Sequence, residues 1–128
     1  MYVVLAWAVV VGLVAQVFLI GLALLAADAS GISLHRNIGW IVHLLPIAVL
    51  VFAWFSRASR GHWMWALASA VVVFLVPIFV LMRDSVPVLA ALHPVAALLA
   101  FPLSLVVALN SLRALRGASP VNIRSVTG

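Results

Sequence analysis

Apolar residues fill this chain in four long runs, and most polar residues lie in the short stretches between them. The runs cover about residues 2–27, 34–56, 63–82 and 87–115. Each run reaches or exceeds the roughly 20 residues that a helix needs to cross the hydrocarbon core of a bilayer. None of the runs contains an acidic residue. The pattern therefore predicts four transmembrane helices.

The connections between the runs are too short to form a domain, so consecutive helices must be antiparallel neighbours. We expect an all-α fold, a polytopic membrane protein whose residues 1–116 form an up-down bundle of four transmembrane helices. Residues 117–128 are expected to form a short polar tail. Asp84 or Ser85 can cap the fourth helix, and Gly117 lies where a C-terminal glycine cap is expected.

Composition agrees with a membrane protein and excludes several kinds of site. The 128 residues are 68% hydrophobic and 7% charged, with too few polar side chains to cover a water-soluble domain. The absence of Cys excludes disulfides, iron–sulfur clusters and thiolate metal sites. The net charge of +5 does not indicate nucleic acid, because the arginines lie at helix ends and in the tail rather than in one patch.

The arginines also predict the orientation of the bundle. Two of them follow the second run and three lie in the C-terminal segment, whereas the other two connections each carry one Arg and one Asp. By the positive-inside rule, both termini and the 57–62 loop are cytoplasmic. His62 in this loop is expected to be an interfacial residue. The use of Arg without Lys, with abundant Ala and Val, indicates a bacterial protein of the cytoplasmic (inner) membrane.

Three histidines lie inside the apolar runs, and they are the candidate functional residues. His35 is expected at the outer end of the second helix, His43 eight residues deeper, and His93 just inside the outer end of the fourth helix. His35 and His43 differ by roughly 12 Å in height, so a compact three-histidine metal site is disfavoured. Imidazoles on two helices can instead hold the iron of a b-type haem from its two faces, in a slot between the helices.

The residues beside the histidines suit a haem. Gly39 lies between His35 and His43 on nearly the same helix face, and small residues follow His93 at helical spacing, which leaves room for a porphyrin. Arg36 lies at the outer boundary, where it can pair with a haem propionate. The cofactor-binding residues we expect are therefore the three histidines with Arg36 and Gly39.

The partner of His93 is open at this point. Counted from the outer helix ends, the depth of His93 matches that of His43 more closely, whereas counted from the inner ends it matches that of His35. A helix tilt of about 20° accounts for this difference. The expected iron ligands are thus His93 and His35, with His43 as the alternative to His35.

The same residues have a second interpretation, in which they only hold helices together. Small residues allow close packing of transmembrane helices, and His43 can form a hydrogen bond with Gln16 at a comparable depth. The chain would then be a structural or accessory subunit of a larger membrane complex, or a homo-oligomer. Independent catalysis has little support, because the membrane segments hold no acidic residue, Cys nucleophile or glycine-rich phosphate loop.

Two short motifs also carry a resemblance. "LHRNIGWIVH" in the second run and "ALHPVAAL" in the fourth resemble the haem-binding four-helix membrane bundles, most closely one half of haem A synthase. The resemblance implies that His35 and His93 are the axial ligands and that Arg36 matches the arginine of that family. The chain departs from the family in having one four-helix unit and Ile32 where a glutamate is expected. It also resembles small bacterial four-helix membrane proteins, which implies an architecture and no activity.

Overall fold

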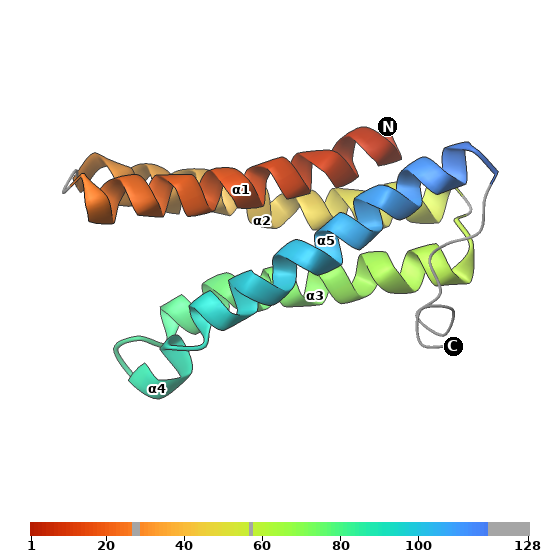
Figure 1. The fold of residues 1–128 in the computed structure, drawn as a ribbon. Helices are drawn as coiled ribbons and strands as arrows, with labels where there is room; N and C mark the ends of the chain where they lie inside the picture. Colours follow the sequence, from red (N-terminus) through yellow and green to blue (C-terminus); the bar gives the residue numbers. More distant parts are fainter. Residues whose placement is uncertain (27–28, 57, 118–128) are drawn as a thin grey trace, which may run out of the picture.

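The computed structural model of the chain describes residues 1–26, 29–56 and 58–117. These residues form helices and turns without strands (Figure 1). The helices are α1 (Tyr2–Leu25), α2 (Ala29–Phe55), α3 (Arg60–Leu81), α4 (Pro87–Ala90) and α5 (His93–Leu115). Four segments are long and apolar enough to cross a membrane, the last of them combining α4 and α5. The predicted all-α fold of a small multi-pass membrane bundle is confirmed at this level.

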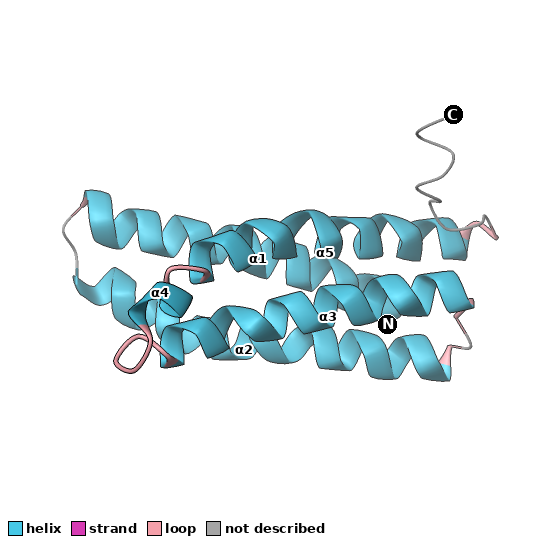
Figure 2. Ribbon diagram, turned by 90° about the horizontal axis from the view of Figure 1, so that it is seen from below, coloured by secondary structure: helices cyan, strands magenta, loops and turns pink. Residues whose placement is uncertain are grey.

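The four long helices run alternately along one axis and form two antiparallel hairpins, α1 with α2 and α3 with α5 (Figures 1 and 2). The hairpins diverge toward the end that holds α4 (Figure 1). We call this the α4 end, and we call the end that holds the turn between α2 and α3 the opposite end. The bundle is therefore not uniform along its axis, and its open part lies at the α4 end.

The core is built from small side chains. Ala53, Val73, Ala100 and Ala108 are fully buried, while most of the large aliphatic and aromatic side chains face outward. Small residues let helix backbones approach closely, which is how transmembrane helices gain packing contacts where lipid provides no hydrophobic driving force. The outward apolar side chains provide the surface that faces lipid.

The second and third helices begin earlier than expected. α2 begins at Ala29 instead of Leu34, and α3 begins at Arg60 instead of Trp63. His35 consequently lies inside α2, more than one turn from its start, rather than at the helix edge.

The fourth span is interrupted, although a single helix was expected. A turn separates α4 from α5, which begins with His93 and Pro94. Proline lacks the N–H that would bond the carbonyl one turn earlier, and it disfavours helical backbone in the residue before it. In the first turn of a helix these properties cost little. The proline therefore ends α4 and makes His93 the first residue of α5.

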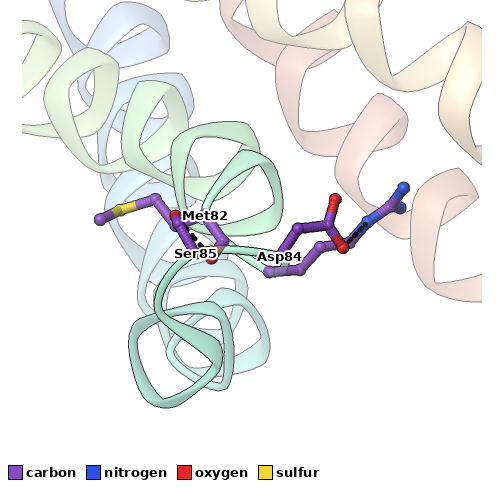
Figure 3. Close-up of polar contacts among 4 residues, drawn as sticks. Met82, Asp84 and Ser85 are labelled. Atoms are coloured by element: carbon purple, nitrogen blue, oxygen red, sulfur yellow. Dashed lines mark hydrogen bonds and ion pairs between the residues drawn. The ribbon is translucent and has the colours of Figure 1, made fainter.

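The connection before α4 differs from the expected cap. Ser85 Oγ donates to the carbonyl oxygen of Met82 at 3.3 Å, and Asp84 forms an ion pair with Arg83 at 3.5 Å (Figure 3). The N-cap of α4 is Val86, without a side-chain hydrogen bond. Asp84 and Ser85 therefore do not cap the helix, because each already has a nearer partner.

At the other end of α5, the glycine cap is confirmed. Gly117 follows the C-cap residue Arg116 and has a φ of 68°, the left-handed conformation that glycine adopts without strain. The rest of the predicted polar tail, residues 118–128, lies outside the described residues.

Two glycines in the first hairpin give a matched test of the packing. A Cβ on Gly31 would lie 2.9 Å from the backbone nitrogen of Ala23, whereas a Cβ on Gly21 would have no atom within 4 Å. We expect Gly31→Ala to lower the free energy of unfolding by about 1–3 kcal/mol, because the close backbone cannot move aside. Gly21→Ala meets no atom and should leave it unchanged or raise it by up to about 1 kcal/mol, because alanine favours the helix. Unfolding in mixed micelles of rising dodecyl sulfate content, followed by circular dichroism, measures both; equal effects would contradict the packing of α2 on α1.

Candidate functional site

A cavity of about 400 Å³ lies between the two hairpins at the α4 end. Its walls contain all three histidines of the apolar runs, and its charged lining residues are Arg36, Arg83 and Asp84. Residues from α1, α2, α3 and α5 contribute to it. The structure therefore gathers the predicted site residues His35, His43, His93, Arg36 and Gly39 around one cavity.

His35 is held to its own hairpin through one ring nitrogen. Its Nδ1 lies 3.0 Å from the backbone carbonyl oxygen of Gln16 on α1. The Gln16 amide nitrogen has two N–H groups and lies 2.9 Å from the same ring nitrogen, to which it can donate in one tautomer of the ring. In the other tautomer, Nδ1 carries the proton and donates to the carbonyl oxygen, because a carbonyl oxygen can only accept. In that second tautomer, Nε2 carries a free lone pair.

His93 is held in the same way on the second hairpin. Its Nδ1 donates to the backbone carbonyl oxygen of Val76 on α3, at 2.9 Å. The bond joins the first residue of α5 to α3 and again leaves Nε2 as the unprotonated nitrogen. His35 and His93 thus belong to different hairpins, and each is oriented by a carbonyl of its own hairpin.

The rings of His35 and His93 lie against each other across the cavity. Their centroids are 6.5 Å apart and their planes cross at 78°. A metal bonded to one nitrogen of each of two opposed rings, at about 2.0–2.1 Å, separates the centroids by roughly 6 Å. The separation is therefore of the size that two axial ligands of one metal require.

His43 lies on the same cavity but has no ring contact with His93 in the part of the chain that the structure describes. Its Nδ1 bonds the carbonyl oxygen of Gly39 one turn earlier on α2. Its Nε2 is buried and has no hydrogen-bond partner among the described residues. Of the two pairings that the sequence leaves open, the geometry thus brings His35, and not His43, against His93.

Gln16 bonds the backbone of α2 rather than His43. With its amide nitrogen toward α2, the side chain donates to the carbonyl oxygen of His35 at 2.8 Å and accepts from the N–H of Gly39 at 3.1 Å. Gly39 permits this approach, because a Cβ there would lie 3.3 Å from the terminal amide of Gln16. The space that Gly39 leaves is therefore occupied in part by the Gln16 amide and in part belongs to the cavity.

Sequence reasoning missed a set of polar contacts between α3 and α5. His62 Nε2 donates to the carbonyl oxygen of Asn110 at 3.1 Å, and the hydroxyls of Ser69 and Ser104 are 2.9 Å apart. Together with the bond from His93 to Val76, these contacts recur every seven residues along α3, at positions 62, 69 and 76. The spacing of seven residues between His62 and Ser69, which places both on one face of a helix, was the sequence feature that could have indicated these contacts.

His62 lies in a helix and not in the expected loop. Because α3 begins at Arg60, His62 lies in its first turn and is only 5% exposed. Its Nδ1 accepts from the Ser59 hydroxyl at 2.6 Å, so both ring nitrogens have partners. His62 is a packing residue of the second hairpin and does not line the cavity at the α4 end.

Across the described ranges, no three or more His, Asp or Glu side chains gather closely enough to hold a bare metal ion. The chemistry available at the cavity is that of two neighbouring imidazole rings with nearby guanidinium groups.

Replacement of Gln16 by Leu tests the contact that shapes this wall of the cavity. Gln16→Leu keeps a similar volume but removes both hydrogen bonds to α2, so we expect the free energy of unfolding to fall by about 0.6–1.7 kcal/mol. Val17→Leu, at the adjacent outward-facing position, is the matched control and should have no measurable effect. An unchanged stability for Gln16→Leu in the same micelle titration would contradict the bridging role of the amide.

Comparison with protein families, with curated proteins and with solved structures finds no match to this chain. The function of the cavity is therefore inferred from its own residues.

Proposed function

We propose that the chain binds one b-type haem between α2 and α5 at the α4 end, with His35 and His93 as the axial ligands, for electron transfer or haem handling. The observation that carries this proposal is the opposed ring pair, 6.5 Å apart and drawn from two different hairpins. Bundle interiors commonly hold such cofactors between side chains of facing helices.

The hydrogen bonds of the two rings support ligation. Histidines that bind a metal usually donate their other ring N–H to a carbonyl or carboxylate, which fixes the tautomer and the ring orientation. His35 and His93 both have Nδ1 at a backbone carbonyl, at 3.0 Å and 2.9 Å. In the tautomer with the proton on Nδ1, both Nε2 atoms are lone-pair donors, the state that iron requires.

The volume and charge of the cavity are those of a cofactor pocket. Its volume of about 400 Å³ lies within the roughly 300–1,000 Å³ of cofactor pockets. Arg36 and Arg83 line it, and guanidinium groups bind carboxylates such as haem propionates in a bidentate manner. Asp84, 3.5 Å from Arg83, can orient this arginine. Gly39 leaves one wall without a side chain.

The chain's own residues would bind and orient the group rather than react. Bound haem supplies a one-electron redox centre, whose potential depends on its ligands and surroundings. His35 and His93 would hold the group from two sides, and the chemistry it would then supply is electron transfer rather than reaction at an open metal position. The carbonyl bonds of Nδ1 hold both rings in place.

The resemblance to one half of haem A synthase implies the same ligand pair. Ile32 lines the cavity where that family is expected to carry a glutamate, so the resemblance supports haem binding without the oxidase chemistry. In a bacterial cytoplasmic membrane with both termini inside, the α4 end would face the outer side. An electron partner would then approach from that side.

A second candidate function is that of a structural or accessory subunit, alone as a homo-oligomer or within a larger membrane complex. One observation favours it: every histidine in the cavity already bonds a backbone carbonyl, and two of these bonds join neighbouring helices. Such bonds stabilise a bundle without any cofactor. Both candidates use the same residues, so a test must separate ligation from packing.

A reduced-minus-oxidised visible spectrum of detergent-purified protein, from cells supplied with haem, tests the proposal. We expect a b-type difference spectrum that is lost in His35→Ala and in His93→Ala and kept in His43→Ala. Loss in His43→Ala with retention in His35→Ala would instead make His43 the second ligand. A flat spectrum from folded, haem-supplied protein would overturn the proposal, and stoichiometric partners that copurify with it would support the accessory role.

Asparagine variants separate ligation from packing. The amide nitrogen of Asn lies nearly where Nδ1 of His lies, so His35→Asn and His93→Asn can keep the bond to the carbonyl but cannot ligate iron. We expect both to lose the haem spectrum and to keep the stability of the haem-free protein. The alanine variants should lose both, with a stability loss of about 1 kcal/mol. Haem retention in both asparagine variants would exclude this ligand pair.

A further inference from the structure

A second hollow lies at the opposite end, beside the turn from α2 to α3. It has a volume of about 720 Å³ and is open to the surroundings. Its lining consists of the last turn of α2, the turn residue Ala58 and the beginning of α3, and the side chains that matter are Trp54, Phe55, Arg60 and Trp63. None of these residues lines the cavity at the α4 end.

The charge of this hollow favours an anion. No hydrogen bond or ion pair of the Arg60 guanidinium is found among the described residues. Arg60 is also the first residue of α3, whose N-cap Ser59 makes no side-chain bond to the helix backbone. The Ser59 hydroxyl is instead occupied by His62. The first N–H groups of a helix carry partial positive charge, which adds to that of the arginine.

The walls of the hollow favour an amphipathic ligand. The Trp54 and Phe55 side chains are 71% and 77% exposed, and Trp63 is half-buried. Aromatic rings of membrane proteins concentrate at the level of the lipid headgroups, where one side is apolar and the other is wet. The hollow lies at the ends of two membrane-spanning helices and therefore at this level.

We propose that this hollow is a binding site for the headgroup of an anionic phospholipid. Arg60 and the start of α3 bind the phosphate diester, while Trp54, Phe55 and Trp63 contact the glycerol and the upper part of the acyl chains. A free phosphate has a similar charge, but it has no apolar part that could contact the three aromatic side chains. The site is independent of haem binding, because it shares no residue with the cavity at the α4 end.

Quenching by brominated lipid locates the site. The full chain, with Trp7, Trp40 and Trp65 replaced by Phe, emits only from Trp54 and Trp63. It is reconstituted into phosphatidylcholine vesicles that contain a small fraction of brominated phosphatidylglycerol or, in a parallel sample, brominated phosphatidylcholine. We expect an apparent preference of about fivefold for the anionic lipid, the value of one basic residue at a membrane surface. Equal quenching by the two lipids would overturn the proposal.

Charge variants and free phosphate provide the controls. Arg60→Gln should abolish the preference, whereas Arg116→Gln removes the same charge at the same end of the bundle and should retain it (Figure 1). Retention of the preference in Arg60→Gln would contradict the site. Inorganic phosphate should not displace the brominated phosphatidylglycerol; displacement would mean that the hollow binds free anions instead. As a second measurement, wild-type protein should copurify with more phosphatidylglycerol than Arg60→Gln, and equal amounts would count against the proposal.

Discussion

A ring N–H inside a membrane must find an acceptor within the protein, and in this chain backbone carbonyl oxygens provide it. Lipid offers no hydrogen bond, so an unsatisfied imidazole would cost several kcal/mol. His35 uses the carbonyl of Gln16, and His93 uses that of Val76. Each bond lies within one hairpin and orients the ring. A single requirement of the solvent thus sets the direction of both side chains.

The two hairpins owe their internal stability to different contacts. In the first hairpin, Gln16 inserts its amide beside the missing side chain of Gly39. In the second, polar contacts recur along α3 at heptad intervals, from His62 to the carbonyl of Val76. Between the hairpins, small buried residues provide the packing. Each hairpin can therefore keep its own geometry while a cavity opens between them.

The sequence predicts the class of this fold well and its details less well. Hydropathy runs suffice for four spanning helices, because length and apolar content are local properties. The choice between His35 and His43 depends on how the hairpins tilt, which residue counts along one helix do not determine. The burial of His62 was missed because its partner is the backbone carbonyl of Asn110. Every residue has a backbone carbonyl, so the sequence does not mark this one as a partner. The interruption before His93 was foreseeable from Pro94, whose effect on the preceding turn is local.

The divergence of the hairpins has an energetic consequence for any ligand of the cavity. A site whose two opposed ligands come from separate hairpins is complete only when both hairpins are in place. A group that bonds both rings therefore binds the assembled bundle and not the separated hairpins, so its binding free energy adds to the stability of their association. An empty cavity lacks those packing contacts. The α4 end is packed least closely by the protein's own side chains. A bound group can therefore add most to the stability of hairpin association at this end.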